Sequence, residues 1–234
     1  MVDAATAERL RPLEKLKGLE STHLLINEIY ASIQGESTHA GRACVFVRTS
    51  VCNQRCSYCD TAYAFTGGEA MRIDEVVRQA LSHGIELVEI TGGEPLLQPL
   101  LPSLCTRLLE AGCEVLIETG GSHDTSVIPE GVHTILDIKT PGSREEHAND
   151  YGNLQRLRTG DEVKFVLTSR QDYDWSAALV TRENLHERTT VLFSPAWGLL
   201  EPAQLAAWIV ADQLPVRLNL QLHKYVWGPT KRGV

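Results

Sequence analysis

The sequence predicts an α/β fold built as an incomplete β/α barrel, and three observations support this class. Strand-like and helix-like segments alternate from residue 23 onward. The strand-like segments are rich in Val, Ile and Leu, as expected for strands covered on both faces of a parallel sheet. About 210 residues follow the first 21, whereas a complete eight-fold barrel typically takes roughly 250. The length therefore favours a partial barrel that does not close.

Eight segments have the composition of strands and are mostly bounded by Gly, Pro or Ser. They are residues 23–30, 43–47, 86–90, 114–117, 133–136, 162–167, 190–193 and 216–222. Four segments between them repeat apolar residues at helical spacing. These are residues 73–81, 100–109, 175–182 and 202–211, and Gly84 and Gly112 follow the first two as expected caps. This alternation predicts a parallel sheet with helical crossovers.

Charge and composition narrow the range of functions. The 234-residue chain has 22 Lys and Arg against 30 Asp and Glu, a formal net charge of -8. An acidic chain is poorly suited to neutralising phosphates, so no direct nucleic-acid partner is expected. No apolar run approaches the roughly 18–20 residues of a membrane span, and residues 1–21 lack the apolar core of a signal peptide. We expect a cytoplasmic protein with a mobile, charged extension at residues 1–21 and a single domain at residues 22–234.

Three of the six cysteines lie within eight residues. Cys52, Cys56 and Cys59 have the spacing C-x3-C-x2-C, in a predicted loop after the strand at residues 43–47. Clustered cysteines in a reducing compartment more often bind metal or carry redox chemistry than form disulfides. Thiolate is also the usual ligand of iron–sulfur clusters. Three thiolates on a four-iron cluster would leave one iron open to a cofactor.

The alternatives for this motif are a zinc site with a distant fourth ligand, or free thiols. A structural zinc site normally has four protein ligands, and no fourth Cys or His lies at finger spacing. The nearest candidate, His39, is thirteen residues upstream of the first cysteine. The remaining cysteines, Cys44, Cys105 and Cys113, are isolated among apolar residues and are predicted to be small buried side chains.

Polar residues also follow five of the predicted strands. In parallel α/β folds, ligands bind at the carboxyl ends of the strands, so these residues predict one shared site. They comprise Arg48 with the cysteine motif, Thr91-Gly92-Gly93-Glu94-Pro95, Glu118-Thr119-Gly120-Gly121, Asp137-Ile138-Lys139 and His223-Lys224-Tyr225.

The cysteine motif, the aromatic Tyr58 within it and the Gly92-Gly93-Glu94-Pro95 segment resemble the radical S-adenosylmethionine (SAM) superfamily. In that superfamily the open iron of a 4Fe-4S cluster binds the amino and carboxylate groups of SAM. One electron from the cluster then cleaves SAM and yields a 5′-deoxyadenosyl radical. The resemblance implies that the Gly-Gly-Glu-Pro segment contacts the methionine end of SAM.

Further segments resemble the 7-carboxy-7-deazaguanine synthase family of the queuosine precursor pathway. They are Ile33-Gln34-Gly35-Glu36, Val45-Phe46-Val47-Arg48, Cys59-Asp60-Thr61, Ile117-Glu118-Thr119-Gly120 and His223-Lys224-Tyr225, and the resemblance runs from about Asn27 to the C-terminus. It implies conversion of 6-carboxy-5,6,7,8-tetrahydropterin to 7-carboxy-7-deazaguanine with loss of ammonia, by hydrogen abstraction from C6. It also implies a Mg2+ ion, an electron donor such as flavodoxin, and a homodimer.

The resemblance assigns roles by position. Cys52, Cys56 and Cys59 would hold the cluster, and the Thr61 hydroxyl would bind Mg2+. The residues that would line SAM are Tyr58, Cys59, Asp60, Gly93, Glu94, Asp137, Ile138 and Lys139. The pterin would contact Ile33, Gln34, Gly35, Arg48 and Thr91, with Arg48 holding its carboxylate. Glu118 would be the catalytic group, hydrogen-bonded to the pterin or to SAM.

Simpler interpretations exist for several of these residues. Arg48 alone is typical of a solvated charge. Thr61 could cap a helix, and Asp137 with Lys139 could be a surface ion pair of little energetic weight. The chain also continues past His223-Lys224-Tyr225 through residues 227–234, and the sequence does not say which of them reach the site.

Two other functional classes remain open from the sequence. The first is another short radical SAM enzyme, such as a glycyl-radical activating enzyme, which acts on a protein partner. The second is a non-enzymatic zinc or iron–sulfur binding module.

Overall fold

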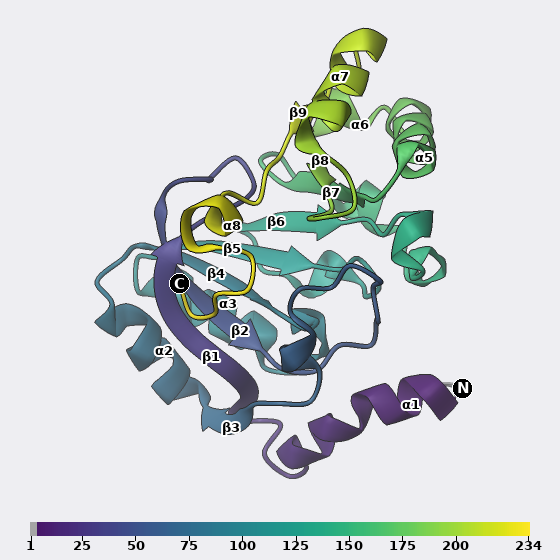
Figure 1. The fold of residues 1–234 in the computed structure, drawn as a ribbon. Coiled ribbons are helices and arrows are strands. Elements are labelled where there is room, and N and C mark those ends of the chain that lie inside the picture. Colours follow the sequence, from purple (N-terminus) through teal and green to yellow (C-terminus); the bar gives the residue numbers. More distant parts are fainter. Residues whose placement is uncertain (1–3) are drawn as a thin grey trace.

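A computed structural model describes residues 4–234, and these residues form one curved sheet of nine strands (Figure 1). The strand order is β3-β1-β2-β4-β5-β6-β7-β8-β9, so β3 and β9 are free edges and the barrel is incomplete, as the sequence predicted. The strands are β1 (His23–Ile33), β2 (Ala43–Thr49), β3 (Glu69–Arg72), β4 (Leu87–Gly92), β5 (Glu114–Thr119), β6 (Val132–Asp137), β7 (Glu162–Leu167), β8 (Thr190–Pro195) and β9 (Arg217–Leu218).

The sheet is mixed rather than wholly parallel, which corrects the sequence-based prediction. From β2 through β4 to β9 each strand pairs in parallel with its neighbour, but β1 runs antiparallel to both β2 and β3. The cause is the connection between β1 and β2, because residues 34–42 contain no crossover helix and parallel neighbours require one. β3, a short strand whose polar sequence gave no signal, pairs with the start of β1.

The four helices with predicted counterparts are α2 (Ile73–Ser82), α3 (Leu101–Glu110), α5 (Arg170–Arg182) and α7 (Pro202–Asp212). Local chemistry fixes where they begin. Asp74 and Glu75 lie in the first turn of α2, where their negative charges interact favourably with the positive end of the helix dipole. At α5 the Ser169 side chain accepts a hydrogen bond from the Asp172 amide. No helix among residues 4–234 combines the length and the apolar character needed to cross a bilayer.

The remaining helices are short. They are α1 (Ala4–Leu10), α4 (Asn153–Arg156), α6 (Leu185–Arg188) and α8 (Leu222–Trp227), with 3-10 turns η1 (Arg11–Leu16), η2 (Ala62–Phe65), η3 (Pro95–Leu97), η4 (Thr125–Val127), η5 (Pro141–Ser143) and η6 (Glu146–Ala148). All the α-helices in this group were missed from sequence, because four to seven residues carry too little periodicity to detect.

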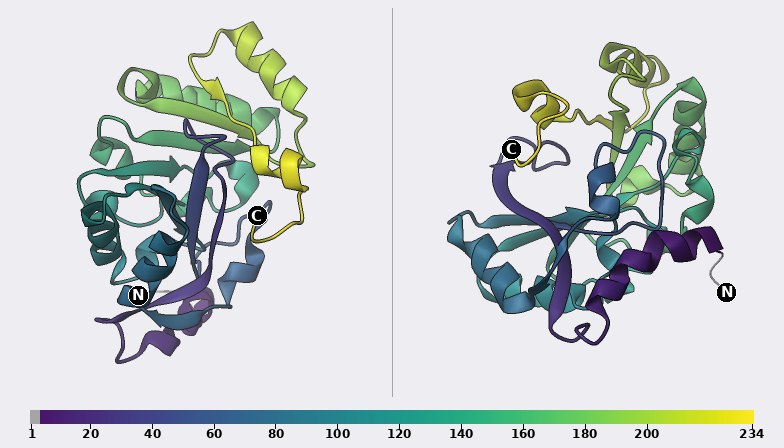
Figure 2. Two further views of the ribbon diagram at one scale, coloured as in Figure 1. Left: turned by 90° about the vertical axis from the view of Figure 1, so that its left-hand side faces the viewer. Right: turned by 60° about the horizontal axis from the view of Figure 1, so that its bottom comes forward.

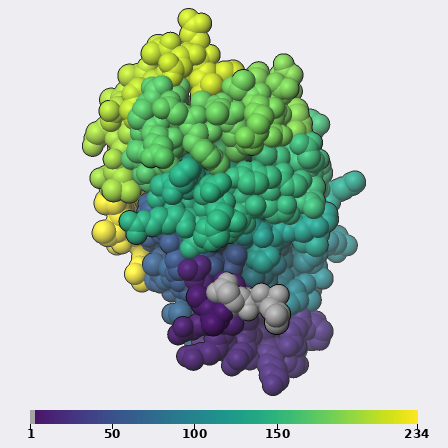
Figure 3. All heavy atoms as spheres, turned by 90° about the vertical axis from the view of Figure 1, so that its right-hand side faces the viewer, coloured from purple at the N-terminus to yellow at the C-terminus, as the bar shows by residue number. Residues whose placement is uncertain are grey.

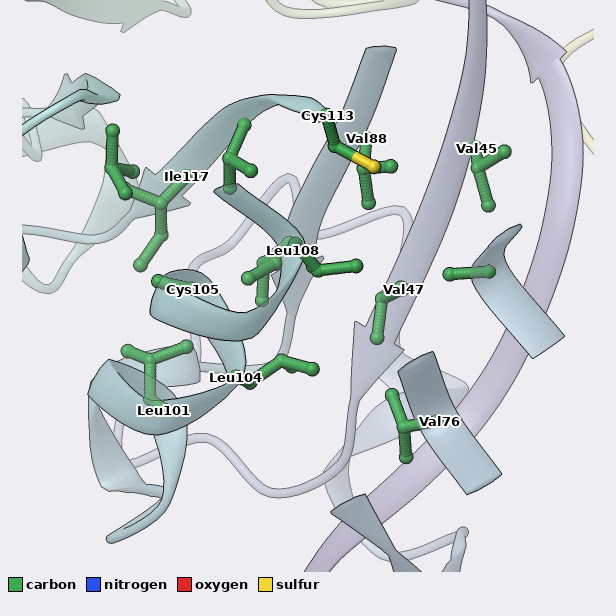
Figure 4. Packing of buried hydrophobic residues seen from close by; sticks show 14 of the residues in the cluster. Val45, Val47, Val76, Val88, Leu101, Leu104, Cys105, Leu108, Cys113 and Ile117 are labelled. Carbon is green, nitrogen blue, oxygen red and sulfur yellow. The ribbon is translucent and has the colours of Figure 1, made fainter. Parts of the chain in front are cut away.

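Two hydrophobic clusters cover the outer face of the sheet. In the first, α2 and α3 pack on β1, β2, β4 and β5, and Cys105 and Cys113 lie within it (Figure 4). The second joins α5 and α7 to β6, β7 and β8. Inside the barrel, Cys44 packs in a smaller cluster with Phe46 and Ile135. The three isolated cysteines are therefore buried free thiols, as predicted.

The end of the chain differs from its prediction. Residues 216–222 were expected to form a strand, but β9 contains only Arg217 and Leu218, and Leu222 begins α8. The chain leaves the sheet because it turns back toward β1, where the Leu222 amide donates to the Gly35 carbonyl at 2.8 Å. As a result α8 lies across the open side of the barrel, beside β1 (Figure 2).

The N-terminal segment was expected to be mobile, whereas its described part has defined structure. The α1 helix lies along the lower part of the molecule on the face seen in Figure 3. Leu16, at the end of η1, is 2% exposed and packs with Leu25 and Val51. Arg9 donates to the Asn53 carbonyl at 2.8 Å and pairs with Glu145 at 3.1 Å. The segment thus contacts the loop that carries the three cysteines.

Candidate active site

A cavity of about 530 Å³ opens at the carboxyl ends of the strands and extends into the barrel. This volume suits a small organic ligand, since such sites commonly measure about 300–1,000 Å³. All five predicted segments contribute to its wall, represented by Arg48, Thr91, Glu118, Asp137 and His223. The prediction that polar residues after five strands share one site is therefore confirmed.

The cysteine loop joins β2 to β3, and Cys52, Cys56 and Cys59 all line the cavity. The loop is held by backbone contacts from two sides, because the Glu94 amide donates to the Val51 carbonyl at 2.8 Å and the Ser57 amide donates to Ser143 at 2.9 Å. Burial raises the pKa of the Cys52 thiol to about 12 and also raises the pKa values of the other two.

The three cysteines are not gathered as the ligands of one zinc ion would be. Ligand atoms around one tetrahedral zinc are close together, since each Zn–S bond is about 2.3 Å. Among residues 4–234, the one set of three Cys, His, Asp or Glu ligand atoms within 4.8 Å of one another contains none of these cysteines. Three free thiols on the wall of one cavity have the donor type of an iron–sulfur cluster, so the residues present fit this group.

The Gly-Gly-Glu-Pro segment turns tightly against the cysteine loop. Gly93 lines the cavity and has no room for a side chain, since a Cβ there would collide with the Val51 carbonyl. The Glu94 carboxylate is fully buried and accepts hydrogen bonds from the Leu96 amide, the Thr119 hydroxyl and the Gly120 amide. Glu94 therefore fastens the turn to the end of β5, and its side chain lies behind the cavity wall.

Asp137 and Lys139 form a buried pair at the end of β6. Lys139 Nζ donates to Asp137 Oδ2 at 2.8 Å, and the two residues are 8% and 6% exposed, so the surface-pair interpretation is wrong. Burial lowers the pKa of Lys139, but the Asp137 charge outweighs it and holds this pKa well above the ordinary value. Ile138 packs into the core, and its backbone amide donates to Lys164.

Two buried polar atoms of this region have no hydrogen-bond partner among residues 4–234. They are Asp137 Oδ1 and the Tyr58 hydroxyl, and both residues line the cavity. Buried polar groups in native proteins nearly always have partners. These two atoms therefore fit a polar ligand bound beside the cysteine loop.

The segment predicted to contact the pterin also lines the cavity. Ile33, Gln34, Gly35 and Thr91 all line it. The Gln34 side-chain amide donates to the buried Glu89 carboxylate, which fixes its orientation.

Arg48 also lines the cavity and is not a solvated charge. Its side chain is 12% exposed, and its Nε donates to Glu28 Oε1 at 2.8 Å. The same guanidinium donates from NH2 to the Tyr30 hydroxyl at 2.9 Å. These two contacts aim the side chain from β2 toward the cavity.

Asp60 and Thr61 follow the last cysteine of the motif and line the cavity entrance. Thr61 occupies the N-cap position of η2, as the simpler interpretation held, but its side chain makes no capping bond there and its hydroxyl instead donates to Asp60 Oδ1 at 2.8 Å. Asp60 Oδ2 pairs with Lys224 Nζ at 2.6 Å. Burial raises the pKa of Asp60, but the Lys224 ammonium more than compensates and holds it below its ordinary value.

Sequence reasoning missed two charged residues inside the barrel. Lys164 on β7 is 3% exposed and contacts Glu36, Glu118 and Asp137 with its ammonium group. Glu89 on β4 is 2% exposed. Burial and the nearby Glu118 carboxylate raise the pKa of Glu89 well above its ordinary value. Each charge is flanked by apolar residues on both sides within its strand, and that pattern was the available signal.

The C-terminal residues, whose position the sequence left open, line the cavity. Residues 228–234 line it, and the Arg232 guanidinium lies 4.0 Å from the centre of the Tyr63 ring. Gln221, just before α8, donates to Glu36 at 3.0 Å, while Lys224 pairs with Asp60. The end of the chain thus joins the segment after β1 to the cysteine loop.

Comparison with known proteins places this site in a class. Residues 46–148, which include the cysteine loop and the Gly-Gly-Glu-Pro turn, match the Radical SAM superfamily. The structure is similar to the crystal structure of QueE from Escherichia coli, with a TM-score of 0.72, 21% identity and coverage of 90% of this chain and 99% of that chain. Fold and site together define a radical SAM protein.

Sequence relatives narrow the class further. The chain is 43% identical over 226 residues to a 7-carboxy-7-deazaguanine synthase of Koribacter versatilis, with 89% of this chain and 99% of the relative covered. It is 42% identical over 214 residues to the synthase of Chlorobaculum tepidum, with 90% and 97% covered. The chain therefore belongs to the 7-carboxy-7-deazaguanine synthase family.

Proposed function

We propose that the chain converts 6-carboxy-5,6,7,8-tetrahydropterin to 7-carboxy-7-deazaguanine with loss of ammonia. The observation that carries the proposal is that the C-x3-C-x2-C loop and the segment at residues 33–35 face the same cavity, whose volume lies in the range of small-molecule sites. The enzyme uses a 4Fe-4S cluster, SAM and Mg2+. With one electron from an external donor, the cluster and SAM would supply the radical chemistry needed to abstract hydrogen from C6 of the substrate.

The cysteine side of the cavity is assigned to the cluster and SAM. Cys52, Cys56 and Cys59 ligate the cluster, and Gly93 lets the backbone approach the methionine end of SAM. The Tyr58 hydroxyl and Asp137 Oδ1, which have no partner among the described residues, form hydrogen bonds with SAM. The remaining SAM contacts are assigned to Asp60, Lys139, the backbone of Ile138 and the backbone of Glu94, whose carboxylate is already occupied within the protein.

The part of the cavity wall formed by residues 33–35 and Arg48 is assigned to the pterin. Gln34, together with the backbone of Ile33 and Gly35, offers donors and acceptors to the planar edge of the ring. Arg48 holds the substrate carboxylate by a charge-assisted hydrogen bond, because its guanidinium is directed by Glu28 and Tyr30 and retains further donors. Thr91 and Glu118 complete the contacts.

Mg2+ is assigned to Thr61. Its hydroxyl is a hard oxygen ligand, and the Asp60 carboxylate at 2.8 Å offers negative charge beside it. Magnesium usually keeps several waters and binds few protein groups, so a single threonine suits an ion that also contacts the substrate carboxylate.

The cavity wall favours a small substrate over a protein substrate. A carbon radical abstracts hydrogen indiscriminately, so the site that forms it must exclude water and other molecules. Here His223 and Lys224 of α8 and residues 228–234 add to the wall of the cavity on the open side of the barrel. They leave less room for a polypeptide loop than an uncovered barrel mouth would, which favours a small substrate over the protein-acting alternative.

The test of this proposal is turnover by the reconstituted protein under anaerobic conditions. With SAM, Mg2+, a one-electron reductant and the carboxypterin, mass spectrometry is expected to detect 7-carboxy-7-deazaguanine. Omitting the carboxypterin should abolish product. Cluster-loaded protein that cleaves SAM but leaves the pterin unchanged would refute the substrate assignment, and formation of a protein-based glycyl radical on an added partner would support the alternative.

The proposal also covers the compartment, the electron donor and the oligomeric state of the enzyme. We assign it to the cytoplasm, where its free thiols stay reduced, with residues 22–234 as the catalytic domain and an electron donor such as flavodoxin. We also assign it a homodimeric state, supported by exposed apolar side chains on and beside α8, where Trp197 and Tyr225 pack together next to Val226 and Trp227. Light scattering during size-exclusion chromatography measures the mass directly, and a monomer would refute the dimer.

A further inference from the structure

Outside the cavity, the structure brings two histidines and one glutamate together at the amino ends of the strands. His39 lies on the loop between β1 and β2, His133 on β6 and Glu162 on β7. One ligand atom from each residue lies within 4.8 Å of the other two. Residues 133 and 137 of β6, and 162 and 164 of β7, point to the same face because side chains alternate along a strand. The cluster is therefore a separate layer of the barrel interior, below Asp137 and Lys164.

The three side chains are arranged as metal ligands usually are. Glu162 is 1% exposed, and its Oε1 lies 3.2 Å from His133 Nε2. Yet that buried nitrogen makes no hydrogen bond of acceptable geometry within the described residues. The rings of His39 and His133 meet edge to face with their centres 5.0 Å apart. Two imidazoles and a carboxylate form a familiar zinc-binding set in which a water or another group takes the fourth position.

The groups around the cluster orient these ligands. His39 Nδ1 lies 2.7 Å from Arg42 NH1 and 3.3 Å from Glu114 Oε1. Because a guanidinium can only donate, Nδ1 accepts the hydrogen bond from Arg42 when no metal is bound. With zinc on Nε2, the proton would move to Nδ1, which would then donate to the Glu114 carboxylate as zinc-bound histidines commonly do, while Arg42 would keep its pair with Glu114. The Thr38 amide donates to Glu162 at 3.1 Å and fixes the carboxylate.

We propose that His39, His133 and Glu162 form a zinc site that is separate from the cysteine loop. The site would join residues 34–42 to β6 and β7. That loop begins with Gln34 and Gly35, which line the cavity. Bound zinc would therefore hold the segment that contacts the pterin, a consequence that rests on the function proposed above.

The test uses the cluster-loaded enzyme, so that zinc cannot occupy the cysteines. The protein is dialysed against buffered Zn2+, and its iron and zinc are measured together by elemental analysis. We expect one zinc per chain in addition to a full complement of iron. His39→Asn, a change on a surface loop, should weaken zinc binding more than about tenfold. Its iron content should not change, and His83→Asn on an exposed turn should behave as wild type.

A second readout follows the loop itself. Because a ligated His39 would fasten residues 34–42, added Zn2+ should slow amide hydrogen exchange in that loop of the wild type and leave it unchanged in His39→Asn. The proposal would be overturned if the wild-type enzyme took up no zinc. It would also be overturned if both His39→Asn and His133→Asn retained the zinc. Neither result depends on catalytic turnover, so the zinc site can fail while the proposed enzymatic function stands.

Discussion

Lys164 Nζ donates a 2.9 Å hydrogen bond to Glu36 Oε2 and thereby joins β7 to the loop that follows β1. The same ammonium group contacts Glu118 on β5 and lies 3.8 Å from Asp137 on β6. Burial raises the pKa of Glu36, but the Lys164 charge outweighs this and keeps it below the ordinary value. Lys164 is therefore the cation that allows several acidic side chains to share one buried site.

Replacing this lysine should destabilise the folded protein. Lys164→Met leaves the partly buried carboxylates of Glu36 and Glu118 without their cation, and breaking a fully buried ion pair in this way typically costs about 3–5 kcal/mol, which is the upper bound here. Denaturant unfolding at neutral pH should show a loss of up to that size. Lys15→Met, which removes an exposed lysine that bonds only a backbone carbonyl, is the matched control. Equal stability of Lys164→Met and wild type would contradict the role assigned to the pair.

Arg48→Ala should weaken substrate binding without affecting the cluster. The variant loses a charge-assisted hydrogen bond to the substrate carboxylate, worth about 1.5–3 kcal/mol, so KM should rise roughly ten- to a hundredfold. Iron content should equal that of wild type, and Arg78→Ala on the exposed face of α2 should leave KM unchanged. If Arg48→Ala binds the pterin with wild-type affinity, Arg48 does not hold the carboxylate.

Gly93→Ala should reduce the amount of cluster that the protein retains. The new Cβ collides with the Val51 carbonyl, so either the cysteine loop or the Gly-Gly-Glu-Pro turn must move. Gly84→Ala is the control, because Gly84 has a positive φ but nothing within 4 Å of its Cβ position. Iron per chain after reconstitution should fall in the first variant and not in the second. Full iron retention by Gly93→Ala would show that this close approach is unimportant for the loop.

Glu89→Gln should change how stability depends on pH. Because its folded-state pKa is raised, Glu89 keeps a proton that the unfolded chain releases above about pH 4.3. Its contribution to stability is complete below that unfolded pKa and is lost as pH rises through the folded pKa. Glutamine does not titrate, so the variant should gain stability relative to wild type as the pH rises above the unfolded pKa toward the raised folded pKa of Glu89. Parallel pH profiles of the two unfolding free energies would contradict a protonated Glu89.

Local patterns predicted most of the sheet and the site, whereas long-range packing decided the rest. Composition located seven of the strands, because buried parallel strands are nearly continuous apolar runs. The direction of β1 depends on its pairing partners, which no local pattern reveals. The sequence placed Arg48 and Asp137 at the cavity because each follows a predicted strand. It missed Lys164 because the role of a charged residue inside a strand cannot be assigned until its partners, here Glu36 and Glu118, are known.

The most direct test of the account asks whether the three-cysteine loop drives chemistry on the pterin. Wild type and Cys52→Ala are reconstituted anaerobically, and absorbance, iron content and 7-carboxy-7-deazaguanine are measured after SAM, Mg2+, reductant and carboxypterin are added. Brown wild-type enzyme should form product, while Cys52→Ala should be colourless and inactive, and Cys105→Ala should keep both colour and activity if it folds. Product formed by colourless Cys52→Ala protein would contradict the central claim.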